Sequence, residues 1–184
     1  MKNNLKIQQR SGFTMIELLI VIVIMGILSA IGLGTFTSSQ MKARDSKRKS
    51  DLRTIGDALE VYYNDYGNYP VGDSGDIIGC GPQAEVDKVA CVAGQIWKNT
   101  TNETTYMVQM PEDPSGGKYY YISLDGSSYQ IYAHLENDKD RDVPENATGD
   151  PTYYVNPETE SGSCEIGDCN YGRSSSNVGL GNTN

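Results

Sequence analysis

Hydrophobic residues are concentrated near one end of the chain. An almost uninterrupted apolar run covers residues 13–34, whereas Tyr, Asn, Asp, Gly, Ser and Thr dominate after Tyr62. A helix of these 22 residues is about 33 Å long, and the hydrocarbon core of a membrane is about 30 Å thick. The run therefore predicts a membrane-spanning helix.

The pattern becomes amphipathic over residues 35–66. Apolar residues recur there at spacings of three and four, which is typical of a helix with one buried face. This stripe consists of Leu52, Ile55, Leu59, Tyr62, Tyr63 and Tyr66. Gly67 can cap a helix and Pro70 cannot continue one, so we expect the helix to end near Tyr66.

The rest of the chain has the pattern of a small β-structure. Residues 67–117 predict a loop region with a short element near Gln95. Two runs rich in Tyr and Ile, 118–124 and 128–135, flank Asp-Gly-Ser and predict an antiparallel hairpin. We expect a β-sheet and an acidic loop over residues 118–163. A disulfide loop and a flexible tail are expected over 164–184, which contains few apolar residues.

Charge and cysteine content narrow the function classes. The net charge of -9 argues against nucleic-acid binding, which requires Lys and Arg to replace counterions on phosphates. Four cysteines favour disulfides and an oxidising compartment, with Cys80 near Cys91 and Cys164 near Cys169. Sequence alone leaves three connectivities open. Zinc is the alternative, but the spacings match no common zinc pattern.

The start of the chain has the composition of a targeting leader. Residues 1–12, MKNNLKIQQRSG, contain three basic residues and no acidic one, and Phe13 opens the apolar run. A secretory signal would be cut after its apolar region, so here any cut is expected before it. Glu17 is the one ionisable residue in the run, and a charged carboxylate in hydrocarbon costs about 2.5–3.5 kcal/mol. Glu17 therefore needs a partner.

The segment RSGFTMIELLIVIVIMGILSAIG resembles the class III leader of type IV pilins and type II secretion pseudopilins. The resemblance implies cleavage between Gly12 and Phe13 by a prepilin peptidase and N-methylation of Phe13. It also implies that Glu17 receives the new terminal amine of a neighbouring subunit. A second segment, PEDPSGGKYYYISLDGSSYQIYAHLENDKD, resembles the two strands and acidic loop of major pseudopilins.

Basic residues after the apolar run bear on which side of the membrane the rest of the chain lies. They are Lys42, Arg44, Lys47, Arg48, Lys49 and Arg53, and they outnumber the basic residues before the run. A positive-inside count would keep the following residues in the cytoplasm. The cysteines and the leader favour the opposite side.

Three acidic residues in the loop after the hairpin are candidate ligands for calcium. Asp138, Asp140 and Asp142 alternate, as oxygen ligands in calcium loops often do. The twelfth position of an EF-hand would fall on Gly149, where a Glu is required. A solvated loop balanced by Lys139 and Arg141 is the alternative to a calcium cofactor.

Two other motifs are weaker. Gly72-Asp73-Ser74-Gly75 matches the tetrapeptide around a protease nucleophile, but His134 is the only histidine and lies in an expected strand, so we expect no enzyme. Asn99, Asn102 and Asn146 head N-x-Thr sequons, which matter only where exported asparagines are glycosylated.

These features predict an α+β pilin fold, in which a long N-terminal helix packs on a small antiparallel β-sheet. The resemblance implies a structural subunit of a type IV pilus-like filament, a helical homo-oligomer extruded by an assembly platform and an ATPase. It is expected in the cytoplasmic membrane with its head outside the cytoplasm, and then in an extracellular or periplasmic filament. The alternatives are a pseudopilin of a type II secretion or DNA-uptake system, and a monomeric membrane-anchored binding module.

Overall fold

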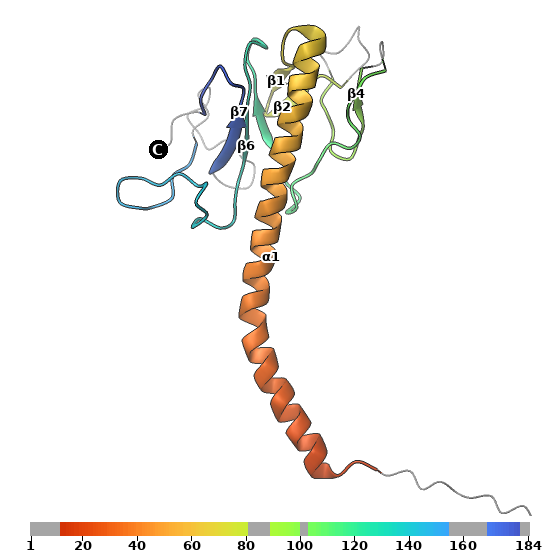
Figure 1. Cartoon of the computed structure of the whole chain (residues 1–184), viewed down its shortest axis with the longest axis vertical. Coiled ribbons are helices and arrows are strands. Elements are labelled where there is room, and N and C mark those ends of the chain that lie inside the picture. Colours follow the sequence, from red (N-terminus) through yellow and green to blue (C-terminus); the bar gives the residue numbers. More distant parts are fainter. Residues whose placement is uncertain (1–11, 81–88, 100–102, 155–168, 181–184) are drawn as a thin grey trace, which may run out of the picture. The chain divides into compact units, whose positions relative to one another are not determined.

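The computed structural model describes residues 12–80, 89–99, 103–154 and 169–180, except for the side chains of residues 31–35. The chain divides into two units, Met1–Gln40 and Met41–Asn184. Helix α1, Met15–Tyr66, begins in the first unit and ends in the second (Figure 1).

The first unit presents apolar side chains to its surroundings. Large apolar residues from Phe13 to Leu28 are 50% to 91% exposed. In the described part of the chain, no helix is both long enough and apolar enough to cross a membrane. The span expected over residues 13–34 is therefore not confirmed.

The end of α1 lies where the sequence predicts it. Gly67 follows Tyr66 with a φ of 74°, in the left-handed region that glycine adopts readily. Its N–H donates to the carbonyl of Tyr63 at 2.7 Å, which is the αL capping motif. Pro70 then prevents the helix from resuming.

In the described parts of the second unit, seven short strands form three antiparallel sheets. The strands are β1 (Val71–Asp73), β2 (Asp76–Ile78), β3 (Trp97–Lys98), β4 (Thr105–Met107), β5 (Tyr120–Ile122), β6 (Gln130–Ala133) and β7 (Tyr171–Ser174). The expected hairpin is β5 with β6, with Tyr121 opposite Ile131. The largest sheet has the order β5-β6-β7. The β1–β2 hairpin adds to the open edge of β5, because Tyr121 N–H donates to the Gly75 carbonyl at 2.9 Å.

Two expectations need correction. Residues 67–117 contain two hairpins, β1–β2 and β3–β4, whereas a loop region with a short element near Gln95 was expected, and β3 lies at that element. The tail expected to be flexible contributes β7, which pairs with β6. Its Arg173 donates to the Arg53 carbonyl at 3.0 Å and to Asp57 at 2.9 Å, so α1 helps to hold this strand.

The core lies between α1 and the sheets. Leu52, Ile55, Leu59 and Tyr62 are at most 2% exposed and pack with aromatic residues of the strands, including Trp97. Burying such a side chain stabilises a fold by about 1.5–3 kcal/mol each. Tyr63 is the exception in the predicted stripe, since it is 41% exposed. The α+β pilin fold is confirmed.

Candidate functional site

The N-terminus of α1 carries the residues expected to act in assembly. Gly12 and Phe13 are exposed, and no atom outside its chain neighbours lies within 4 Å of the position that a Gly12 Cβ would take. The peptide bond between them is thus accessible to solvent. The leader residues 1–11 lie outside the described residues.

Glu17 has a partner in its own chain. Its carboxylate accepts from the Thr14 backbone N–H at 2.9 Å and from the Thr14 hydroxyl at 2.7 Å. In return, Glu17 N–H donates to Thr14 Oγ1 at 3.3 Å. This reciprocal pair is a capping box, which satisfies N–H groups that an α-helix leaves free at its start.

The capping box adds a partner that the sequence argument did not include. The resemblance implied that Glu17 receives a neighbour's amine, and that pairing stays a prediction. Thr14 occupies one oxygen of the carboxylate, Oε2, and the Thr-x-x-Glu spacing in the sequence was the signal for it. A neighbour's amine would therefore add to this contact or replace it.

A buried arginine connects the polar half of α1 to the rest of the second unit. Arg48 is 2% exposed. Its guanidinium donates to Asp45 at 2.7 Å, to Asp113 at 2.7 Å and 3.0 Å, and to Glu136 at 2.8 Å. No local sequence pattern predicts this cluster, because two of the three carboxylates lie 65 and 88 residues further along the chain.

Charges within this cluster shift the pKa of its carboxylates. Hydrogen bonds from Arg44 and then Arg48, against the opposing effect of burial, lower the pKa of Glu136 to about 2. Burial alone would raise the pKa of Asp113, but bonds from Arg48 and Ser115 bring it below its usual value. Both carboxylates are therefore charged at neutral pH.

The same helix also holds the acidic loop. Asp45 accepts the backbone N–H of Glu136 at 2.9 Å and that of Asn137 at 3.0 Å, which fixes the start of the loop. Lys49 donates to Asp140 at 2.5 Å and to Asp142 at 2.7 Å. A lysine of α1, and not Lys139, therefore supplies the main positive charge, although Arg141 lies 3.4 Å from Asp142.

Calcium binding is left open by this geometry. Asp138 is exposed, whereas Asp140 and Asp142 share Lys49. Among the described residues, no group of three or more His, Cys, Asp or Glu side chains is arranged to hold a metal. Calcium at Asp138, Asp140 and Asp142 stays a prediction.

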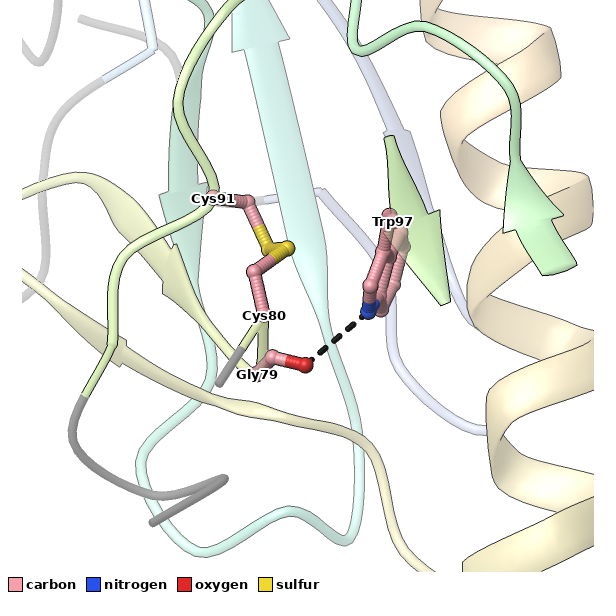
Figure 2. Close-up of a disulfide and its surroundings, with 4 residues drawn as sticks. All are labelled: Gly79, Cys80, Cys91 and Trp97. Atoms are coloured by element: carbon pink, nitrogen blue, oxygen red, sulfur yellow. Dashed lines mark hydrogen bonds between the residues drawn. A yellow bond between two sulfur atoms is a disulfide. The ribbon is translucent and has the colours of Figure 1, made fainter. Parts of the chain in front are cut away.

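One of the expected disulfides is present and lies beside the only tryptophan (Figure 2). Cys80 and Cys91 are bonded, with their Cα atoms 5.0 Å apart. Trp97 Nε1 donates to the Gly79 carbonyl at 3.0 Å, next to Cys80. Cys169 is also disulfide-bonded, and Cys164, its expected partner, lies outside the described residues.

The Gly-Asp-Ser-Gly motif is a tight turn between β1 and β2. Ser74 and Gly75 have φ values of 51° and 85°, as both central residues of a type I′ hairpin turn require. A Cβ at Gly75 would lie 2.5 Å from the Tyr120 ring, so the ring packs directly on the glycine. The motif therefore serves the hairpin.

These features define a class of protein. A helix with an exposed apolar half, a carboxylate in its first turn and a polar half packed on a small β-rich head is the architecture of pilin-like filament subunits.

The comparisons identify the family. Residues 7–33 match the prokaryotic N-terminal methylation motif, and residues 35–148 match type II secretion system protein G. The chain therefore belongs to the type II secretion system protein G family, whose members are structural pilin-like subunits and not enzymes. The leader resemblance and the filament-subunit interpretation are confirmed.

Several curated proteins are similar over most of their length. The type II secretion system core protein G of Pseudomonas aeruginosa is 33% identical over 116 residues, which are 63% of this chain and 75% of that protein. Its counterpart in Vibrio cholerae is 30% identical over 64% of this chain and 74% of its own length. The one in Escherichia coli is 27% identical over 62% and 73%. No solved structure is significantly similar to this chain.

Proposed function

We propose that this chain is a pseudopilin that polymerises into the filament of a type II secretion-type machine. The family match supports this choice over a surface pilus, which was the first interpretation of the leader. The observation that carries the assembly step is the exposed apolar surface of α1 from Phe13 to Leu28, with Glu17 in its first turn. Such a surface needs to be covered by lipid or by other subunits.

The proposed sequence of events begins in the cytoplasmic membrane, with the head outside the cytoplasm. A prepilin peptidase removes residues 1–12, and the amine of Phe13 becomes the new terminus and is methylated. This cationic amine lies close to the carboxylate of Glu17 in sequence. Between subunits, such a pair about 4 Å apart is worth about 4 kcal/mol at an effective dielectric constant of 20. An ATPase and a platform protein drive the extrusion.

Two substitutions separate the charge of Glu17 from its capping role. Glu17→Gln keeps an acceptor for the Thr14 N–H, as Gln does in other capping boxes, but removes the charge. Thr14→Val removes the capping hydroxyl and keeps the charge. If assembly depends on an amine pair, Glu17→Gln reduces filament yield at least about tenfold, which corresponds to about 1.4 kcal/mol, and Thr14→Val reduces it less.

Mass spectrometry of the N-terminus and a secretion assay test the two parts of the proposal. Assembled subunits are expected to begin with methylated Phe13, and intact residues 1–12 in filaments would contradict processing. Cells that lack this chain are expected to retain exported proteins and to keep any surface pili. Loss of surface filaments with normal secretion would instead identify a pilus subunit. Membrane-bound monomers that keep residues 1–12 would identify the binding module.

A further inference from the structure

We propose that Asn146 is an acceptor site for N-linked glycosylation in the folded protein, whereas Asn99, the acceptor residue of another sequon, is buried by the fold. In cells, the proposal rests on the head lying outside the cytoplasm, which is part of the proposed function. Whether Asn146 accepts a sugar in the folded chain can be measured in vitro, independently of where the head lies in the cell.

The sequon Asn146-Ala147-Thr148 lies in an exposed loop with a fixed base. All residues from Glu145 to Asp150 are exposed. At the base, Thr152 N–H donates to the Pro144 carbonyl at 2.7 Å, and Thr152 is 4% exposed. The tip of this loop can therefore enter the active site of another enzyme without unfolding the head.

Inside the loop, the sequon residues already face one another. The Thr148 hydroxyl lies 2.7 Å both from the Asn146 carboxamide oxygen and from an Asp150 carboxylate oxygen, either of which can accept its proton. The Asn146 oxygen also accepts the backbone N–H groups of Thr148 at 3.0 Å and Asp150 at 2.9 Å. The amide nitrogen Nδ2 is nearly uncommitted, since its contact with Asp150 is 3.5 Å long. A sugar on this nitrogen would cost the loop little hydrogen bonding.

The sequon at Asn99 has the opposite environment. Asn99 is 5% exposed and directly follows strand β3. Its backbone N–H donates to the Thr104 carbonyl at 2.8 Å, and its side-chain nitrogen donates to the Tyr106 hydroxyl at 3.3 Å. A bulky glycan on that nitrogen would require this hairpin to open. Asn102 lies outside the described residues.

The reaction requires a sugar donor of the lipid-linked pyrophosphate class and a transferase. The Asn146 nitrogen forms a bond to the anomeric carbon of the sugar, and the bond from that carbon to the pyrophosphate oxygen breaks. The lipid pyrophosphate leaves with the electron pair, and a base in the transferase takes the proton lost by the amide nitrogen. No change of oxidation state is involved.

The test is in vitro transfer to the full-length chain in detergent, with Asn102→Gln present throughout so that two sequons remain. The probes are a purified single-subunit oligosaccharyltransferase that accepts N-x-Thr and a lipid-pyrophosphate-linked oligosaccharide. Glycopeptide mass spectrometry gives the occupancy of each site. We expect transfer to Asn146 to be at least about tenfold faster than to Asn99, a ratio that corresponds to about 1.4 kcal/mol.

Four controls make the result decisive. Asn146→Gln and Thr148→Ala are expected to abolish the fast transfer, and Thr148→Ser is expected to retain it. In chain that has been reduced and unfolded, both sequons are expected to be modified at similar rates. Equal transfer to Asn99 and Asn146 in folded protein would overturn the proposal, as would failure at Asn146 when the unfolded chain accepts sugar there. Neither outcome depends on whether the chain builds a secretion filament.

Discussion

Replacing Arg48 with methionine tests whether the buried ion pairs hold α1 to the head. The Arg48 side chain is 2% exposed and is bonded to Asp45, Asp113 and Glu136. Methionine keeps an unbranched apolar stem but leaves the carboxylates without their shared cation. Removing one partner of a buried ion pair costs about 3–5 kcal/mol. Because a domain is stable by about 5–15 kcal/mol, we expect the variant to lose a large share of its free energy of unfolding.

Urea denaturation of a soluble fragment that begins at Thr35 measures this loss. The fragment retains the whole second unit, Met41–Asn184. Arg53→Met is the matched control, because Arg53 lies on the same helix and the charge change is the same, but its side chain is exposed. The control should change the free energy of unfolding by less than about 0.5 kcal/mol. Equal losses in the two variants would refute the importance of the cluster.

The pH dependence provides a second check. The pKa of Glu136 is about 2 in the folded protein, below its ordinary value of 4.5. A lowered pKa gives stability that is present above pH of about 4.5 and is lost as the pH falls towards 2. Since Glu136 is partly exposed, we expect this contribution to be about 1–2 kcal/mol. Without Arg48, the clustered carboxylates gain stability on protonation, so the deficit of Arg48→Met should be smaller at pH 4 than at pH 7. A constant deficit would show that lost packing dominates.

Three further substitutions test other parts of the structure. Replacing Cys80 and Cys91 together with serine should destabilise the head by about 3 kcal/mol, because the disulfide closes a short loop of 11 residues. Wild type and variant should have the same unfolding midpoint in reductant and different unfolding midpoints in oxidant. Gly75→Ala should lower the melting temperature more than Gly116→Ala. Both glycines have a φ of 85°, but only a Gly75 Cβ would contact a ring, that of Tyr120. Equal melting temperatures would contradict the contact. If calcium binds the acidic loop, it should raise the unfolding midpoint by an amount that increases in Lys49→Met and vanishes in Asp140→Ala; an unchanged midpoint in calcium and in chelator would leave Lys49 as the partner of the loop.

The elements that could be predicted from sequence are those specified by local pattern. The end of α1 follows from Gly67, whose capping role depends only on the residues just before it. The β5–β6 hairpin follows from two Tyr-rich runs with a turn between them, although the strands are shorter than the runs. The Cys80–Cys91 disulfide joins two cysteines that are neighbours in the order of cysteines along the chain, which is one of the three connectivities that sequence alone leaves open. In each case the interacting residues lie close together in the chain.

The parts that could not be predicted depend on distant partners. Strand β7 has little apolar character of its own and is held by its pairing with β6. Its own Arg173 also contacts Asp57 of α1, which is 116 residues away in sequence. Lys49 reaches Asp140 across 91 residues. Tyr119 donates to Asp51 at 2.7 Å across 68 residues, and this bond is also invisible in any local pattern. Such pairs decide which of several locally permitted structures forms.

Several of the basic residues after the apolar run form ion pairs in the folded chain. By count they favoured a cytoplasmic location for the residues that follow. Arg44, Arg48 and Lys49 are bonded to carboxylates from the segment 113–142, so their charges are largely balanced within the head. These pairs can form only if residues 44–49 and 113–142 lie on the same side of the membrane. The Cys80–Cys91 disulfide lies between these two segments in sequence and requires an oxidising compartment. The ion pairs and the disulfide together therefore support the proposed placement of the head outside the cytoplasm, against the count of basic residues.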